Sequence, residues 1–113
     1  MEQHYKLHRV RELADGDEEF VKALAEAFLE EVPEDARLLQ IAVDSKDYLA
    51  TYQSAHKMKP TIDLFELGVF DDLIVVQDWG KFEQKSKDVS NELAIVLKAV
   101  EKTVEEIKAD FNL

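Results

Sequence analysis

One histidine, His56, lies in a setting suited to nucleophilic chemistry on phosphorus. It sits within Ala55-His56-Lys57-Met58-Lys59-Pro60, in the middle of an expected helix. An imidazole is nucleophilic near neutral pH without activation, because much of it is unprotonated around its ordinary pKa of about 6.5. Lys57 and Lys59 bring positive charge to one short stretch of an acidic chain. An ammonium group of this kind stabilises the charge that spreads over phosphoryl oxygens during transfer.

The helical spacing around His56 places it at the edge of an apolar stripe. Residues three, four and seven positions away share its side of the helix, namely Gln53, Lys59, Pro60 and Asp63. The apolar stripe runs one residue behind it, through Tyr52, Ala55 and Ile62. We therefore expect the imidazole to reach water while the helix fixes its position. The alternative is an ordinary surface histidine beside two lysines, and residue types alone do not separate the two interpretations.

The other residues that could carry chemistry form no comparable pattern. His4 and His8 are four residues apart and would share a helix face, where a carboxylate could complete a transition-metal site. We favour two exposed histidines near the terminus, since no HExxH arrangement is present. The chain has no cysteine, no Gly-rich phosphate-binding loop and no GxSxG elbow, which argues against a conventional small-molecule enzyme.

Length and composition indicate a single domain, residues 1–113, in the cytoplasm. A chain of 113 residues holds one core, and 46% hydrophobic with 35% charged residues is a globular mixture. The formal charge of −11 disfavours binding to nucleic acid or to anionic membranes, since both need clustered Lys and Arg. No apolar run approaches the roughly 20 residues that span a bilayer.

The elements that must position His56 are helical, since three glycines and two prolines are too few for the turns of an all-β fold. Apolar periodicity predicts a short helix at Tyr5–Leu13 and four longer ones at about 18–43, Tyr48–Leu67, Phe70–Phe82 and Ser86–Phe111. We expect the second helix to continue through Pro33 with a kink, in preference to two abutting helices. The run Leu73-Ile74-Val75-Val76 has strand propensity, but it is short and lacks a partner strand.

Helices with one apolar stripe can bury it only against each other. The expected fold is therefore all-α, an antiparallel (up-down) four-helix bundle with a short N-terminal capping helix. The expected stripe of the first helix is Leu7, Val10 and Leu13, and that of the second is Phe20, Leu24, Ala27, Phe28, Val32, Ala36, Leu39 and Val43.

The segment Ala55-His56-Lys57-Met58-Lys59 resembles the signature of histidine-containing phosphotransfer (HPt) domains, whose pattern is Ala-His-x-Leu/Ile/Met-Lys. The resemblance extends over most of the chain in the order of its helices. It covers Asp17-Glu18-Glu19-Phe20, Phe28-Leu29-Glu30-Glu31 and Leu38-Leu39 before the histidine helix, the break at Ser45-Lys46-Asp47, and the closing Lys108-Ala109-Asp110-Phe111.

This resemblance implies a role for each matching residue. His56 would accept the phosphoryl group and Lys59 would steer and stabilise it. Gln53 and Lys57 are candidate supporting residues because of their positions near His56 on the helix and not because of the resemblance. The implied partners are receiver domains of a hybrid histidine kinase and of a response regulator. These partners carry the aspartyl phosphate and supply Mg²⁺, so the module needs no cofactor of its own and has no autonomous kinase activity. A monomer is expected, since the histidine face must stay open.

The chain departs from the family pattern beyond the histidine. Small residues are usual four, seven and ten places on, whereas this chain has Pro60, Asp63 and Glu66, and its Gly68 comes two places late. Pro60 removes a helical hydrogen bond to the carbonyl of His56. Asp63 would lie about 10 Å along the axis from His56, and at that range its charge would weaken docking without blocking it. The alternative function is thus an inactive HPt-like module that binds receiver domains or other proteins without phosphotransfer.

Overall fold

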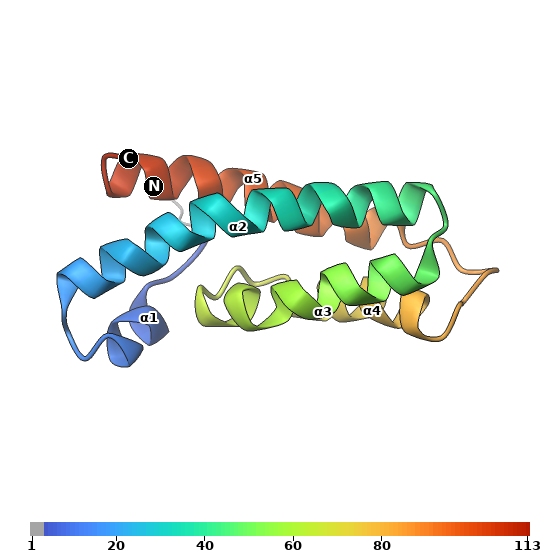
Figure 1. The fold of residues 1–113 in the computed structure, drawn as a ribbon, viewed down its shortest axis with the longest axis horizontal. Coiled ribbons are helices and arrows are strands. Elements are labelled where there is room, and N and C mark those ends of the chain that lie inside the picture. Colours follow the sequence, from blue (N-terminus) through green and yellow to red (C-terminus); the bar gives the residue numbers. More distant parts are fainter. Residues whose placement is uncertain (1–3) are drawn as a thin grey trace.

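The computed structural model describes residues 4–113, and the described chain consists of five α-helices without a strand. The helices are α1 (His8–Leu13), α2 (Glu18–Asp44), α3 (Tyr48–Leu64), α4 (Phe70–Lys81) and α5 (Ser90–Asp110), as Figure 1 shows. The all-helical prediction is confirmed. The run Leu73-Ile74-Val75-Val76 lies inside α4, so its strand propensity is overridden by packing of the helix.

Helix α2 begins and continues as its sequence predicts. The carboxylate of Asp17 caps it by accepting the backbone N–H groups of Glu19 at 3.0 Å and Phe20 at 3.3 Å. Glu18 and Glu19 lie in the first turn, where the positive end of the helix dipole favours negative charge. The helix passes through Pro33 and runs for 27 residues without a break. The prediction of one helix across the proline is therefore confirmed.

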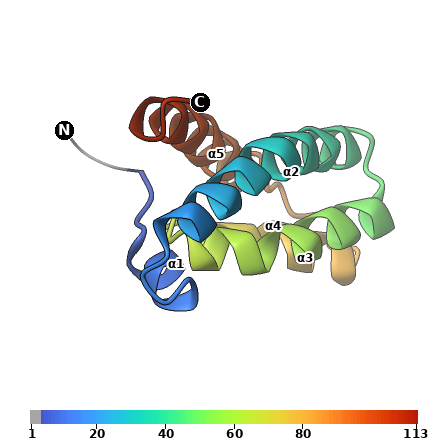
Figure 2. The ribbon, with the colours of Figure 1, turned by 60° about the vertical axis from the view of Figure 1, so that its left-hand side comes forward.

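The long helices pack so that each has two neighbours. Helix α2 contacts α3 and α5, helix α4 contacts the same two, and the short α1 packs against α2 (Figures 1 and 2). The largest fully buried side chains lie between them and come from every helix and from the segments before α1 and after α3: Tyr5, Val10, Phe28, Leu39, Met58, Ile62, Phe65, Leu73 and Ile107. Five helices around one such core are compatible with a helical bundle.

Two residues of the expected stripes of the first and second helices face water. Leu13 and Phe20 are exposed, although both were expected to face the core. At the start of α2 the buried positions are Val21, Ala25, Phe28 and Val32, spaced four, three and four residues apart. The buried positions are therefore shifted by one residue in the first two turns, to Val21 and Ala25, and coincide with the predicted ones at Phe28 and Val32. Phe20 lies beside these positions and faces water.

Three helix ends differ from the prediction by three or four residues. Helix α1 begins at His8 instead of Tyr5, α5 begins at Ser90 instead of Ser86, and α3 ends at Leu64 instead of Leu67. The early end of α3 has a local cause. Glu66 and Gly68 both have positive φ, at 49° and 76°, and this left-handed backbone cannot continue a right-handed helix.

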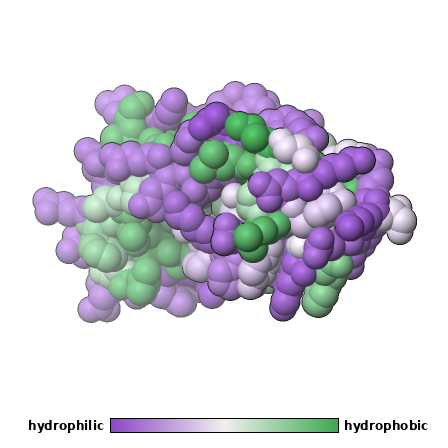
Figure 3. Space-filling view, turned by 45° about the vertical axis from the view of Figure 1, so that its right-hand side comes forward, coloured by the Kyte–Doolittle hydropathy of each residue, from purple (hydrophilic) through white to green (hydrophobic). Residues whose placement is uncertain are grey.

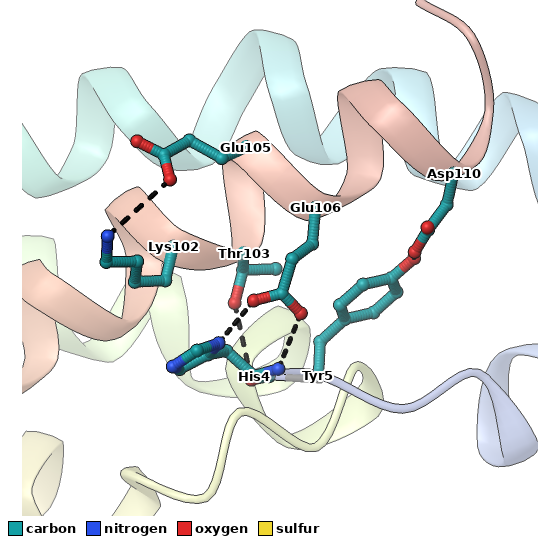
Figure 4. Close-up of polar contacts among 7 residues, drawn as sticks. All are labelled: His4, Tyr5, Lys102, Thr103, Glu105, Glu106 and Asp110. Atoms are coloured by element: carbon teal, nitrogen blue, oxygen red, sulfur yellow. Dashed lines mark hydrogen bonds and ion pairs between the residues drawn. The ribbon is translucent and has the colours of Figure 1, made fainter. Parts of the chain in front are cut away.

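The segment before α1 is held against α5 by a group of polar contacts (Figure 4). The backbone N–H of His4 donates to the Glu106 carboxylate at 2.6 Å, and its Nδ1 pairs with the same group. The Tyr5 hydroxyl donates to Asp110 at 2.6 Å, and burial together with this contact raises the pKa of Tyr5 well above its ordinary value. These bonds make residues 4 and 5 part of the folded domain.

The outer surface is mainly hydrophilic. The face in Figure 3 is largely covered by polar and charged side chains, with separate groups of apolar ones between them. The large apolar side chains that remain exposed are Leu13, Phe20, Leu38, Ile41, Leu49, Phe82, Ile95 and Leu113. Within residues 4–113 no helix combines the length and apolar content needed to cross a bilayer.

Candidate functional site

The candidate site is built on the outer face of α3, around His56. The carboxylate of Asp47 caps this helix by accepting the N–H of Ala50 at 3.0 Å. Ala55 and Met58, on either side of His56 in sequence, are buried in the core and fix the helix from behind. The imidazole itself is exposed. The expected position of His56, on a rigid helix and open to solvent, is confirmed.

An aromatic ring lies beside the imidazole. Tyr52, one turn before His56, has its ring centroid 5.6 Å from that of the histidine, with the two planes inclined by 36°. Tyr52 is half-buried, so it forms a wall along one side of the imidazole. Tyr52 was expected only in the apolar stripe of the helix, so this contact with His56 was not predicted. Its spacing of four residues from His56 was the available signal.

Helix α4 holds the backbone of Tyr52 through Gly80, which is buried. A Cβ atom on Gly80 would lie 2.5 Å from the carbonyl oxygen of Tyr48 and 2.8 Å from the backbone nitrogen of Tyr52. Only a residue without a side chain permits this close approach of α3 and α4. Gly80 thus supports the site from beneath, and the sequence signal for it was only an isolated glycine inside an apolar helix.

The two lysines next to His56 have different surroundings. Lys57 Nζ lies 3.0 Å from Asp35 Oδ1, and the Asp35 side chain, on α2, is only 9% exposed. The hydrogen bond and the charge of Asp35 raise the pKa of Lys57 above its ordinary value. Lys57 is therefore directed toward α2. Lys59 is half-buried one turn after His56, and no carboxylate in the described part of the chain forms an ion pair with it.

The positions that depart from the family pattern lie in distinct surroundings. Pro60 is an exposed residue inside α3, and the helix continues past it to Leu64. Asp63 is paired with Arg9 of α1, whose Nη1 lies 3.0 Å from Asp63 Oδ1. Glu66 was expected on the histidine helix, but α3 ends before it. Asp63 and Glu66 are the two acidic residues that replace small residues of the family pattern. Of these two, only Asp63 lies on the face of the helix that carries His56.

A shallow apolar groove runs between α2 and α3 on the N-terminal side of His56. It has a volume of about 270 Å³ and is lined by Leu38, Ile41, Ala42, Ser45, Asp47, Ala50, Gln53 and Ser54. Leu38 and Ile41 are large exposed apolar residues of α2. Gln53 connects the groove to the site, because it lies one turn before His56. The sequence did not identify these groove residues, since their position depends on how α2 packs on α3.

The structure does not join His4 and His8 into one site. His8 Nε2 lies 2.9 Å from Glu12 Oε1 on α1, whereas His4 pairs with Glu106 on α5. Among residues 4–113 no cluster of three or more histidine, cysteine or acidic side chains is arranged to hold a metal ion. The two histidines contact separate carboxylates, one on α5 and one on α1.

Comparisons of the chain with models of protein families, with curated proteins and with solved structures found no match. The resemblance to HPt domains therefore depends on the motif around His56 and on the order of the helices. Any function assigned to the chain must be argued from its own residues.

Proposed function

We propose that this protein is a phosphorelay intermediate of the HPt type, which accepts and donates a phosphoryl group on His56. The observation that carries the proposal is an exposed imidazole on a helix anchored by buried Ala55 and Met58. Lys59 supplies a cation one turn away on the same side of the helix. An exposed nucleophile of this kind needs no substrate pocket, because a partner protein can bring the phosphoryl group to it.

The chemical step is a transfer between an acyl phosphate and an imidazole. The unprotonated ring nitrogen of His56 donates its electron pair to phosphorus, while the bond from phosphorus to the aspartyl oxygen breaks and its electrons leave on the carboxylate. The phosphorylated ring carries a positive charge until its remaining N–H releases a proton to water. Lys59 stabilises the phosphoryl oxygens during this exchange. In the reverse reaction the ring takes up a proton from water, the carboxylate of a second aspartate attacks phosphorus, and the phosphorus–nitrogen bond breaks to return the neutral imidazole.

The partners in this proposal are receiver domains, which supply the aspartyl phosphate and Mg²⁺. The groove beside Gln53 supports a docking role, since Leu38 and Ile41 offer exposed apolar surface close to the nucleophile. The finer architecture that we propose is an antiparallel four-helix bundle with α1 capping one end. The contacts of α2 and of α4 with both α3 and α5 support it. We expect the protein to act as a cytoplasmic monomer.

The proposal is tested by incubating the purified protein with a panel of phosphorylated receiver domains. We expect at least one receiver to transfer label to the protein, and the label to be acid-labile and stable to base. Mass spectrometry at neutral pH should locate it on His56. A well-folded helical protein that takes no label from any receiver would overturn phosphotransfer in favour of an inactive binding module, and so would label on another residue.

The two lysines are expected to differ when each is replaced by alanine. Lys59→Ala should slow phosphotransfer by about tenfold to a hundredfold, because it removes the cation that stabilises the transferred group. Lys57→Ala should leave the rate within about twofold and lower the melting temperature, because it leaves the buried Asp35 without its partner. Rapid-quench transfer assays and thermal unfolding followed by circular dichroism measure the two effects. Equal losses of rate in both variants would contradict this division of roles.

A further inference from the structure

We propose that Arg9 of α1 is a docking residue of the phosphotransfer surface, which neutralises Asp63 so that an acidic partner can cover His56. The inference rests on the proposed function and adds a second helix to its site. Asp63 lies two turns beyond His56, and its negative charge would repel a phosphorylated receiver. Neutralisation of Asp63 by Arg9 leaves a face that such a receiver can approach.

Arg9 holds Asp63 by two contacts from one guanidinium nitrogen. Its Nη1 lies 3.0 Å from the carboxylate oxygen Oδ1 and also donates to the backbone carbonyl of Asp63 at 3.2 Å. A third contact fixes the segment that carries Arg9, since the backbone N–H of Lys6 donates to the carbonyl of Phe65 at 2.8 Å. Figure 2 shows α1 beside the end of α3. The N-terminal segment is thus fastened to the same end of α3 at two places.

The pair is placed where a partner would meet it. Asp63 is seven residues after His56, so it lies on the same face of α3 about 10 Å away. An interface of standard size covers about 800 Å² of each protein, which corresponds to a radius of about 16 Å. A receiver centred on His56 therefore reaches Asp63. The side chains of Arg9 and Asp63 are 45% and 49% exposed, so both remain open to that partner.

The charge on this face opposes the proposed partner unless Arg9 is present. A receiver brings a phosphoryl group and carboxylates that hold its metal, and this chain has a net charge of −11. The hollow next to Asp63, about 390 Å³ in volume, is lined by the acids Asp63, Glu66 and Asp71 and the bases Lys6 and Arg9. Removal of Arg9 would leave three carboxylates with a single base. Like charges at an interface rim slow association and make its rate depend on salt.

The test compares three variants of the full chain in transfer from one phosphorylated receiver. At 50 mM salt Arg9→Gln should lower the second-order rate constant for phosphotransfer from the receiver about fivefold. The phosphotransfer rate at saturating receiver should not change. The loss should fall below about twofold at 1 M salt, where the Debye length is about 3 Å. The double variant Arg9→Gln/Asp63→Asn should regain the wild-type rate. Arg11→Gln is the matched control, since it removes the same charge from α1 but its partner is Glu18.

A purely structural role for Arg9 gives a different pattern. The melting temperature would then fall in Arg9→Gln and remain low in the double variant, with no salt-dependent change in transfer, and this would overturn the inference. Wild-type protein that takes no label from any receiver would overturn the proposed phosphotransfer. The role of Arg9 in docking would then be decided by titrating the same receivers into wild type and Arg9→Gln. Weaker, salt-sensitive binding to Arg9→Gln supports it. Equal binding, or no binding to wild type, overturns it.

Discussion

Replacement of His56 by glutamine is expected to abolish phosphorylation of the protein and to leave its fold intact. Glutamine has a side chain of similar length and polarity, but its amide nitrogen has no electron pair available for attack on phosphorus. Transfer should therefore fall below detection, and no other group in the site can replace a nucleophile that forms the covalent intermediate. The change should shift the free energy of unfolding by no more than about 0.5 kcal/mol, because His56 is exposed.

Phosphotransfer assays with radiolabelled receiver, run beside circular dichroism, measure both parts of this expectation. His8→Gln provides a matched control, since His8 is exposed on α1 and its Nε2 contacts Glu12 at 2.9 Å. That variant should be labelled as wild type. Labelling of His56→Gln at the normal level would exclude His56 as the carrier. Receiver binding that is equally tight in wild type and in His56→Gln, without labelling of either, would instead indicate the inactive module.

The sequence was sufficient for the features that depend on one helix at a time. Periodicity predicted the helical class, the continuation of α2 through Pro33 and the exposed position of His56, because each follows from the spacing of apolar residues along one segment. The end of α3 was placed three residues late, since positive φ at Glu66 is not readable from a residue type that commonly continues helices. Phosphotransfer itself remains a prediction.

Most of the features that the sequence did not reveal are contacts between helices. Lys57 and Lys59 look alike in the motif, and only the packing of α2 on α3 brings Asp35 to one of them. Arg9 and Asp63 are 54 residues apart, so no local pattern joins them. Pairings of this kind depend on the axial position and rotation of each helix against its neighbour. Those are set by the whole core and not by any one stripe.

The close approach of α4 to α3 at Gly80, behind the site, predicts a large loss of stability when a side chain is added there. Gly80→Ala should destabilise the protein by about 2 kcal/mol, since the added methyl group would lie 2.5 Å from the carbonyl oxygen of Tyr48 and 2.8 Å from the nitrogen of Tyr52. Both are backbone atoms of α3 and cannot rotate away. This cost outweighs the gain of about 1 kcal/mol in helix propensity from glycine to alanine. The expected fall in melting temperature is about 8 °C.

Thermal unfolding followed by circular dichroism tests this, with Lys81→Ala as the control at the adjacent exposed position of α4. The control should stay within about 0.5 kcal/mol of wild type. An unchanged or raised melting temperature in Gly80→Ala would mean that α3 and α4 do not approach as closely as described. If the helices separate to admit the methyl group, Tyr52 must move with α3. Phosphotransfer should then slow even in protein that remains folded, because the wall beside His56 is displaced.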